Sequence, residues 1–162
     1  MFKSKIDIIA EIGVNHDGKF NKAIKLIQQA KKCGADTVKF QTFFSSQFVK
    51  KNTQKVLYQS RTTPTKESHF EMIKSLELSE YDFFRIFNFC KKIKINFLST
   101  PYDLKALEIL KKLKVKRYKT ASTDLVDHIL HKEIIKTKKP VIISTGASSL
   151  EEIRRTIKLY QK

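Results

Sequence analysis

The hydrophobic residues of the chain follow two spacings in turn. Short runs of consecutive apolar residues predict buried strands, and they alternate with stretches in which apolar residues recur every three or four positions, which predict helices. Ala23, Ile27 and Ala30, for example, share one face of the stretch 20–33, and Gly34 follows where a helix usually ends. The predicted strands lie at the start of 8–18 and at 37–42, 95–99, 115–121 and 140–144; the predicted helices are 20–33, 66–76, a segment starting at Ser79, 103–113, 126–136 and 149–159.

Polar residues mark the starts of several of these helices. Capping-box patterns begin at Ser79 and Ser149, and Asp103 is suited to cap the helix that follows it. A strand followed by a helix, repeated five times, predicts parallel strands with helical crossovers, in either an open α/β sheet or a barrel. The polar connection 43–65 is longer than about 12 residues, a length at which loops are usually functional or disordered.

Composition narrows the class of protein. The 162 residues suffice for one domain with a core, and 41% hydrophobic against 30% charged residues describe a soluble globular chain. The net charge of +17 suits an anionic partner, but the lysines are spread over outer helix faces and form no aromatic-interleaved basic motif, so we expect no specific nucleic-acid partner. No apolar run approaches about 18 residues, so no membrane association is expected.

The two cysteines indicate the cellular compartment. Cys33 and Cys90 lie far apart and form no C-x-x-C pair, which favours small core positions in a reducing compartment over a disulfide or a zinc site. We therefore expect a cytoplasmic protein.

The stretch 8–18 carries the first candidate chemistry. Glu11 lies in an apolar run, where a buried carboxylate costs several kcal/mol unless a cation or a hydrogen-bond donor meets it. Asn15 and His16 follow in a loop, and His16 is expected to act as a donor or proton carrier. The other histidines, His69, His128 and His131, are expected to face solvent.

Polar residues of a reactive kind lie at the end of every predicted strand. They are Glu11; Lys39 and Gln41; Ser99 and Thr100; Lys119 and Ser122; and Ser144, Thr145 and Gly146. In parallel α/β folds the carboxyl ends of the strands lie on one face, so these groups are expected to converge on one site.

The types of residue at these strand ends point to an anionic ligand. Strand alternation places Lys39 and Gln41 on one face and Val38 and Phe40 on the other. Lysines directed into a shared site require an anion, and hydroxyl groups suit phosphate or carboxylate. A phosphorylated ligand is one interpretation; a structural ion pair of Glu11 with Lys39 or Lys119 is the other.

Several of these residues lie in longer motifs. Residues 11–18 read EIGVNHDG, followed in order by VKFQT (38–42), LELS (76–79), FLSTPYD (97–103), YKTAS (118–122) and PVIISTG (140–146). In these motifs the chain resembles the sialic acid synthase family, which includes N-acetylneuraminate synthase and its legionaminate and pseudaminate relatives. The resemblance extends over nearly the whole chain.

The resemblance implies a (β/α)8 TIM-type barrel and a transferase that condenses phosphoenolpyruvate with an N-acetylmannosamine-type sugar, an N-acetylated hexosamine, to form a nonulosonic acid. It also implies a divalent metal, Mn or Mg. Residues expected to bind the carboxylate and phosphate of phosphoenolpyruvate are Lys39, Thr100, Lys119 and Ser122.

Other roles follow from the same resemblance. Glu11 would be the acid/base and sugar-orienting carboxylate, so Glu11, Lys39 and Lys119 form the catalytic set. Gln41 and the turn 144–146 would line the pocket. The chain departs from the family pattern at Thr62 or Thr63, where an asparagine is common, and at Thr123, where a glycine is often found, so the sugar preference is open.

The resemblance also sets an expectation about extent. A closed barrel needs eight βα units and about five are predicted here, so residues 1–162 are expected to form one incomplete barrel domain. The later strands, the metal-ligand histidines and the antifreeze-like domain of the family would lie beyond Lys162. A truncated or split synthase of this kind would have little activity alone, and its open edges would invite a second chain or a homo-oligomer.

Two alternatives remain open at this point. The chain could be a non-catalytic anion-binding or partner-binding fragment, which its charge and open edges would suit. It could also be another phosphoenolpyruvate-condensing sugar-acid synthase, such as a 3-deoxy-octulosonate phosphate synthase.

Overall fold

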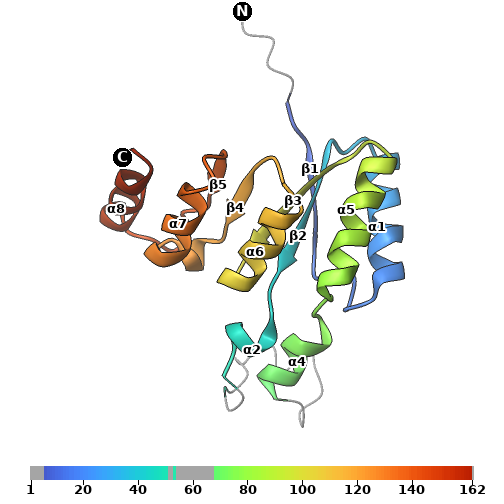
Figure 1. Cartoon of the computed structure of the whole chain (residues 1–162), viewed down its shortest axis with the longest axis horizontal. Helices are drawn as coiled ribbons and strands as arrows, with labels where there is room; N and C mark the ends of the chain where they lie inside the picture. Colours follow the sequence, from blue (N-terminus) through green and yellow to red (C-terminus); the bar gives the residue numbers. More distant parts are fainter. Residues whose placement is uncertain (1–5, 51–52, 54–67, 162) are drawn as a thin grey trace, which may run out of the picture.

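In the part of the chain that the structure describes, five strands alternate with helices (Figure 1). The computed structural model describes residues 6–50, 53 and 68–161. The strands are β1 (Ile9–Gly13), β2 (Thr37–Thr42), β3 (Asn96–Pro101), β4 (Tyr118–Thr120) and β5 (Val141–Ile143). The helices are α1 (Phe20–Lys32), α2 (Ser45–Phe48), α4 (His69–Ser75), α5 (Glu80–Lys92), α6 (Leu104–Lys112), the 3₁₀ helix η1 (Ser122–Asp124), α7 (His128–Ile135) and α8 (Leu150–Tyr160).

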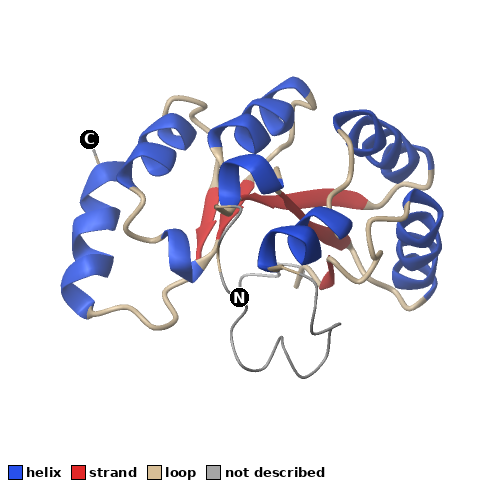
Figure 2. Ribbon diagram, turned by 90° about the horizontal axis from the view of Figure 1, so that it is seen from below, coloured by secondary structure: helices blue, strands red, loops and turns tan. Residues whose placement is uncertain are grey.

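All paired strands are parallel, as the alternation of strands and helices predicts. Hydrogen bonds join β1, β2 and β3 in that order and β4 to β5, and β3 and β4 lie side by side. Figure 2 shows α1, α5, α6, α7 and α8 in an arc along one side of the strands. The opposite face is therefore the one on which a site can form.

The core lies between the strands and this arc of helices. Val38 and Phe40 of β2 are fully buried in it, together with Ile27 of α1 and Ile86 of α5. The intervening residues of β2, Lys39 among them, are only partly buried and point to the other face. The predicted alternation in β2 is confirmed.

The pairing of β1 with β2 places Glu11 opposite Lys39. The register then shifts between Glu11 and Gly13, and Gly13 has a φ of +53°, which favours glycine. The loop after this bulge is held close to the connection between α4 and α5. A methyl group added to Gly18 would lie 2.2 Å from the Ser75 carbonyl oxygen, so only glycine fits there.

The helix caps predicted at Ser79, Asp103 and Ser149 are confirmed. Ser79 and Asp82 cap α5 reciprocally, Ser149 and Glu152 do the same for α8, and the Asp103 carboxylate accepts from the Ala106 N–H at the start of α6.

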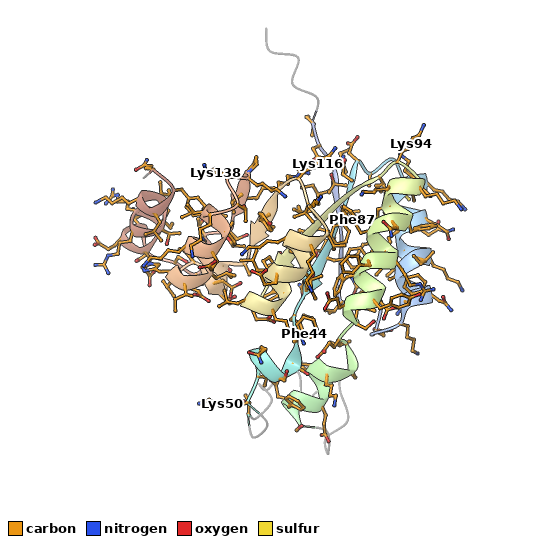
Figure 3. The ribbon with its side chains drawn as sticks, in the orientation of Figure 1. Phe44, Lys50, Phe87, Lys94, Lys116 and Lys138 are labelled. Atoms are coloured by element: carbon orange, nitrogen blue, oxygen red, sulfur yellow. The ribbon has the colours of Figure 1, made fainter. Side chains whose placement is uncertain are left out.

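Three helices end in turns that carry a lysine in the left-handed region. Lys94 after α5, Lys114 after α6 and Lys138 after α7 have φ values of +56°, +55° and +55°. These turns lead into β3, β4 and β5, and they lie at the top of Figure 3, at the amino ends of the strands.

Some expectations are wrong. The third strand runs two residues further than 95–99, because residues as far as Pro101 keep the β2 register, so Ser99 lies inside it. The long connection after β2 begins with α2, and η1 follows β4; neither helix is predicted by the sequence pattern.

Two residues differ from expectation in burial. Cys33 is exposed rather than a core residue, while Cys90 is buried as expected. His131 does not face solvent, because its ring packs edge-on against Tyr160 and is fully buried. No helix in the described part of the chain is long and apolar enough to cross a membrane.

Candidate functional site

Lys39 and Glu11 form an ion pair on the face of the sheet opposite the helices. The Lys39 ammonium lies 2.5 Å from a Glu11 carboxylate oxygen. The Lys39 side chain is only 15% exposed, whereas that of Glu11 is 49% exposed. Glu11 is therefore not the buried carboxylate that its apolar run predicts; it lies at an open surface and meets its cation there.

Lys119 lies near this pair. Its ammonium donates to the Thr120 carbonyl oxygen at 2.6 Å and to the Ser144 hydroxyl. Burial is the largest cause that lowers the pKa of Lys119, and repulsion from the Lys39 ammonium lowers it further, against the opposing effects of Glu11 and Asp124. The two lysines from separate strands thus face a common space.

Gln41 and Thr100 extend the same face. They are opposite each other in the β2–β3 register, two positions beyond Lys39 and Leu98. The added methyl at Gly13 would lie 3.3 Å from Glu11 Oε1 and 3.9 Å from Gln41 Nε2, so both side chains approach the bulge.

Ser122 and the turn after β5 close one side of this region. A methyl group added to Gly146 would lie 3.6 Å from the Ser122 hydroxyl oxygen. Thr145 and Gly146 are exposed, and the Ser144 hydroxyl contacts Lys119. The structure therefore brings together Lys39, Gln41, Thr100, Lys119, Ser122 and residues 144–146, with Glu11 beside them.

The structure places three predicted site residues elsewhere. Ser99 is fully buried on the helix side, where its hydroxyl shares a 2.7 Å hydrogen bond with Thr42 and donates to the Phe40 carbonyl oxygen. His16 stacks on Phe40, on the side of the core, and its Nδ1 accepts from the Gly18 N–H. Asn15 is exposed in the loop after β1.

Sequence reasoning did not single out two groups of this region. Asp124, at the end of η1, has one carboxylate oxygen that is buried without a hydrogen-bond partner among the described residues. Burial raises the pKa of Asp124, and burial together with the carboxylates of Asp124 and Glu11 raises the pKa of Tyr102. Their positions in the sequence could have identified both residues as candidates, because each lies within a few residues of a predicted strand end.

The described residues contain no group of three or more His, Cys, Asp and Glu side chains arranged to hold a metal ion. The described part of the chain therefore does not form, by itself, the Mn or Mg site that the resemblance implies.

We expect the free energy of unfolding to fall as the pH drops below about 6.5, the ordinary pKa of histidine. Burial lowers the pKa of both His16 and His131, so the native chain keeps them neutral at a pH where the unfolded chain takes up protons. The unfolded state then binds more protons than the native state, so the free energy of unfolding decreases as the pH decreases.

This effect is measured by urea unfolding at a series of pH values from about 7.5 down to about 5. A His16→Gln, His131→Gln double variant should show a shallower decline than the unmodified chain, even if it is less stable throughout. His128→Gln, at an exposed histidine, is the control. An equally steep decline in the double variant would show that other groups cause it.

Comparisons with known proteins identify a family over most of the chain. Residues 26–162 match the model of the NeuB family. The N,N'-diacetyllegionaminic acid synthase of Legionella pneumophila is 40% identical over 150 residues, which are 93% of this chain and 42% of that protein. The chain spans less than half of the length of curated relatives that it matches.

Solved structures agree on the fold. The N-acetylneuraminic acid synthetase of Leptospira borgpetersenii, solved with citrate, superposes with a TM-score of 0.84 at 27% identity, over 98% of this chain and 50% of that one. A truncated 3-deoxy-D-arabino-heptulosonate 7-phosphate synthase of Thermotoga maritima superposes with a TM-score of 0.64 at 9% identity, over 95% and 46% of the two chains, and this likeness shows the fold alone.

Proposed function

The chain belongs to the NeuB family, and we propose that it supplies the phosphoenolpyruvate-binding part of a synthase that forms a nonulosonic acid from an N-acetylmannosamine-type sugar. The observation that carries the proposal is the pair Lys39 and Lys119. Their ammonium groups come from separate strands and share one space, with Glu11, Thr100 and Ser122 beside it. Phosphoenolpyruvate carries two anionic groups, and two adjacent cations suit them.

The proposed binding mode assigns one charge to each end of the ligand. Lys119, already held by the Ser144 hydroxyl and the Thr120 carbonyl, presents a fixed ammonium to one anionic group. Lys39 meets the other, and an arriving anion competes with Glu11 for it. Glu11, which is half exposed, is then free to orient the sugar or to exchange a proton with it.

The proposed reaction joins two carbons. As the C2–C3 double bond of phosphoenolpyruvate opens, C3 forms a bond with the sugar aldehyde carbon, and the aldehyde oxygen becomes a hydroxyl. Water adds at C2, the bond from C2 to the phosphate oxygen breaks, and the C2 carbonyl forms. The two protons of the water end on the new hydroxyl and on the inorganic phosphate that leaves. The lysines offset the charge of the carboxylate and the departing phosphate, which is how positioned cations accelerate such steps. If the synthase uses a divalent metal, its ligands would come from outside the described residues.

The proposal includes a larger barrel. Among the described strands, β1 and β5 are the outermost, because β3 and β4 lie side by side and each of the two outer strands has a neighbouring strand on one side only. Strands from a further segment, a second chain or another copy could pair at these edges and complete a (β/α)8 barrel. We also propose that the protein acts in the cytoplasm, without a specific nucleic-acid or membrane partner.

Calorimetry with phosphoenolpyruvate tests the proposal on the whole chain. We expect binding that persists between about 0.15 M and about 1 M salt, over which the Debye length falls from about 8 Å to about 3 Å. Lys119→Ala should weaken it at least about tenfold, because a hydrogen bond to a charged group is lost. Lys158→Ala, at an exposed lysine of α8, should leave it unchanged.

The same titrations examine a second candidate function. The net charge of +17 would let the chain act as a general anion-binding fragment. Binding that vanishes at high salt, is equal for inorganic phosphate, and ignores Lys119 would favour that fragment over the synthase site.

A further inference from the structure

A hollow lies at the opposite end of the strands from Lys39 and Lys119. It has a volume of about 870 Å³, within the usual range for small-ligand pockets. It lies between the carboxyl ends of α5 and α6 and the amino ends of β3 and β4. We call it the lysine cavity, after Lys91, Lys94, Lys114 and Lys116 in its lining. Figure 3 labels Phe87, Lys94 and Lys116 at its margins.

The charge of the lysine cavity is one-sided. Two further cations in the lining already have carboxylate partners, since Lys112 pairs with Glu80 and Arg117 with Asp7. Lys91, Lys94, Lys114 and Lys116 make no ion pair with any residue that the structure describes. Asp7 is the only acidic residue among the described residues of the lining, and Arg117 offsets it.

The helix ends beside the cavity do not cancel this charge. A helix carboxyl end carries about half a negative charge, so α5 and α6 together supply about one. The four lysines without a carboxylate partner supply four positive charges. The cavity therefore keeps an excess of about three positive charges, and an anion is the ligand that its field favours.

One wall of the lysine cavity is aromatic. Phe84 and Phe87 lie on one face of α5, three residues apart, and Phe97 of β3 meets Phe87 edge-on at a centroid distance of 5.6 Å. The Lys91 ammonium lies 4.4 Å from the centre of the Phe87 ring, so charge and aromatic surface adjoin. Anionic and flat apolar groups could be bound side by side.

We propose that the lysine cavity binds a phosphorylated ligand with a flat aromatic group, as in a nucleotide. The phosphates contact Lys94, Lys114 and Lys116, and the ring lies against Phe84 and Phe87. Residues 1–5 are a poor occupant on charge, because their ionisable side chains are Lys3 and Lys5. The proposal does not depend on the function of the site at the other end of the strands.

Calorimetry with ADP on the whole chain tests this proposal with matched variants. Lys94→Asn and Lys114→Asn each remove one cavity charge, and asparagine tolerates the positive φ of both positions. Lys138→Asn removes the same charge at a position with the same φ as Lys114, outside the cavity. We expect each cavity variant to weaken ADP binding about fivefold, and the control less than about twofold.

Two further titrations complete the test. Pyrophosphate, which lacks the ring, should bind at least about tenfold more weakly than ADP, since stacking on an aromatic side chain contributes to affinity. Lys119→Ala should leave ADP binding unchanged. The proposal is overturned if Lys138→Asn weakens binding as much as the cavity variants, if pyrophosphate binds as tightly as ADP, or if ADP binding requires Lys119.

Discussion

Replacing Lys39 and Lys119 together with alanine is expected to lower the affinity for phosphoenolpyruvate at least about 100-fold, because each lost hydrogen bond to a charged group costs about 1.5–3 kcal/mol. The two ammonium groups lie close enough that Lys39 lowers the pKa of Lys119. With both removed, the remaining donors on this face, among the residues that the structure describes, are neutral hydroxyl and amide groups such as Ser122 and Gln41. The acidic Glu11 and Asp124 would then repel the ligand.

Calorimetry at raised salt measures this effect. Lys132→Ala with Lys158→Ala is the matched control, because it removes two exposed lysines of α7 and α8 and changes the net charge equally. Thermal unfolding should show that the double variant at the site stays folded, since Glu11 is half exposed and tolerates the loss of its partner. An equal loss of affinity in the control would mean that general charge, and not this site, attracts the ligand.

Phe40→Ala is expected to lower the free energy of unfolding by about 3–5 kcal/mol, the usual cost of truncating a large aromatic residue in a core. The Phe40 side chain is fully buried and lies between two rings. His16 stacks on it at a centroid distance of 5.9 Å and Phe97 at 5.7 Å. The substitution therefore leaves a cavity beneath β2 and removes the support of the loop after β1.

Urea unfolding monitored by circular dichroism measures the loss. Tyr81→Ala removes a ring of similar size that is 71% exposed, and it should change stability by less than about 1 kcal/mol. Phe40→Leu should fall between the two because it fills part of the cavity. A Phe40→Ala variant as stable as Tyr81→Ala would show that the space collapses without cost.

The sequence predicted the elements that depend on local chemistry. Strand alternation in β2 placed Lys39 opposite the core, and the capping boxes at Ser79 and Ser149 set helix starts within a residue. The order of strands and helices predicted the parallel pairing. These features depend on near neighbours in the chain, so a single sequence contains the information for them.

Features that depend on distant residues were harder to predict. The register of β3 against β2 places Ser99 on the helix side. The sequence pattern predicted that the strand ends at residue 99, two residues too early, so Ser99 was expected at a strand end and not inside the strand. His131 is buried because Tyr160, 29 positions later, packs on it and accepts or donates a 2.7 Å hydrogen bond. No local pattern at either residue records these partners.

The candidate site shows the same division. The strand ends predicted that Lys39, Lys119, Ser122 and Ser144 would share a face. Asp124 was missed because its importance lies in burial beside Lys119, which the 3₁₀ turn η1 creates after β4 ends. The catalytic and binding roles assigned to these residues remain predictions until the ligand experiments are done.

The three lysines at positive φ after α5, α6 and α7 bear on how the isoelectric point of this protein could be changed. Each occupies a turn that a glycine or asparagine would satisfy with less backbone strain. Replacing Lys94, Lys114 and Lys138 with glycine or asparagine would therefore remove three positive charges and reduce the backbone strain of three turns. These substitutions lie outside the strands and away from the Lys39 face. At these three positions one substitution changes both the net charge of the protein and the strain of the backbone.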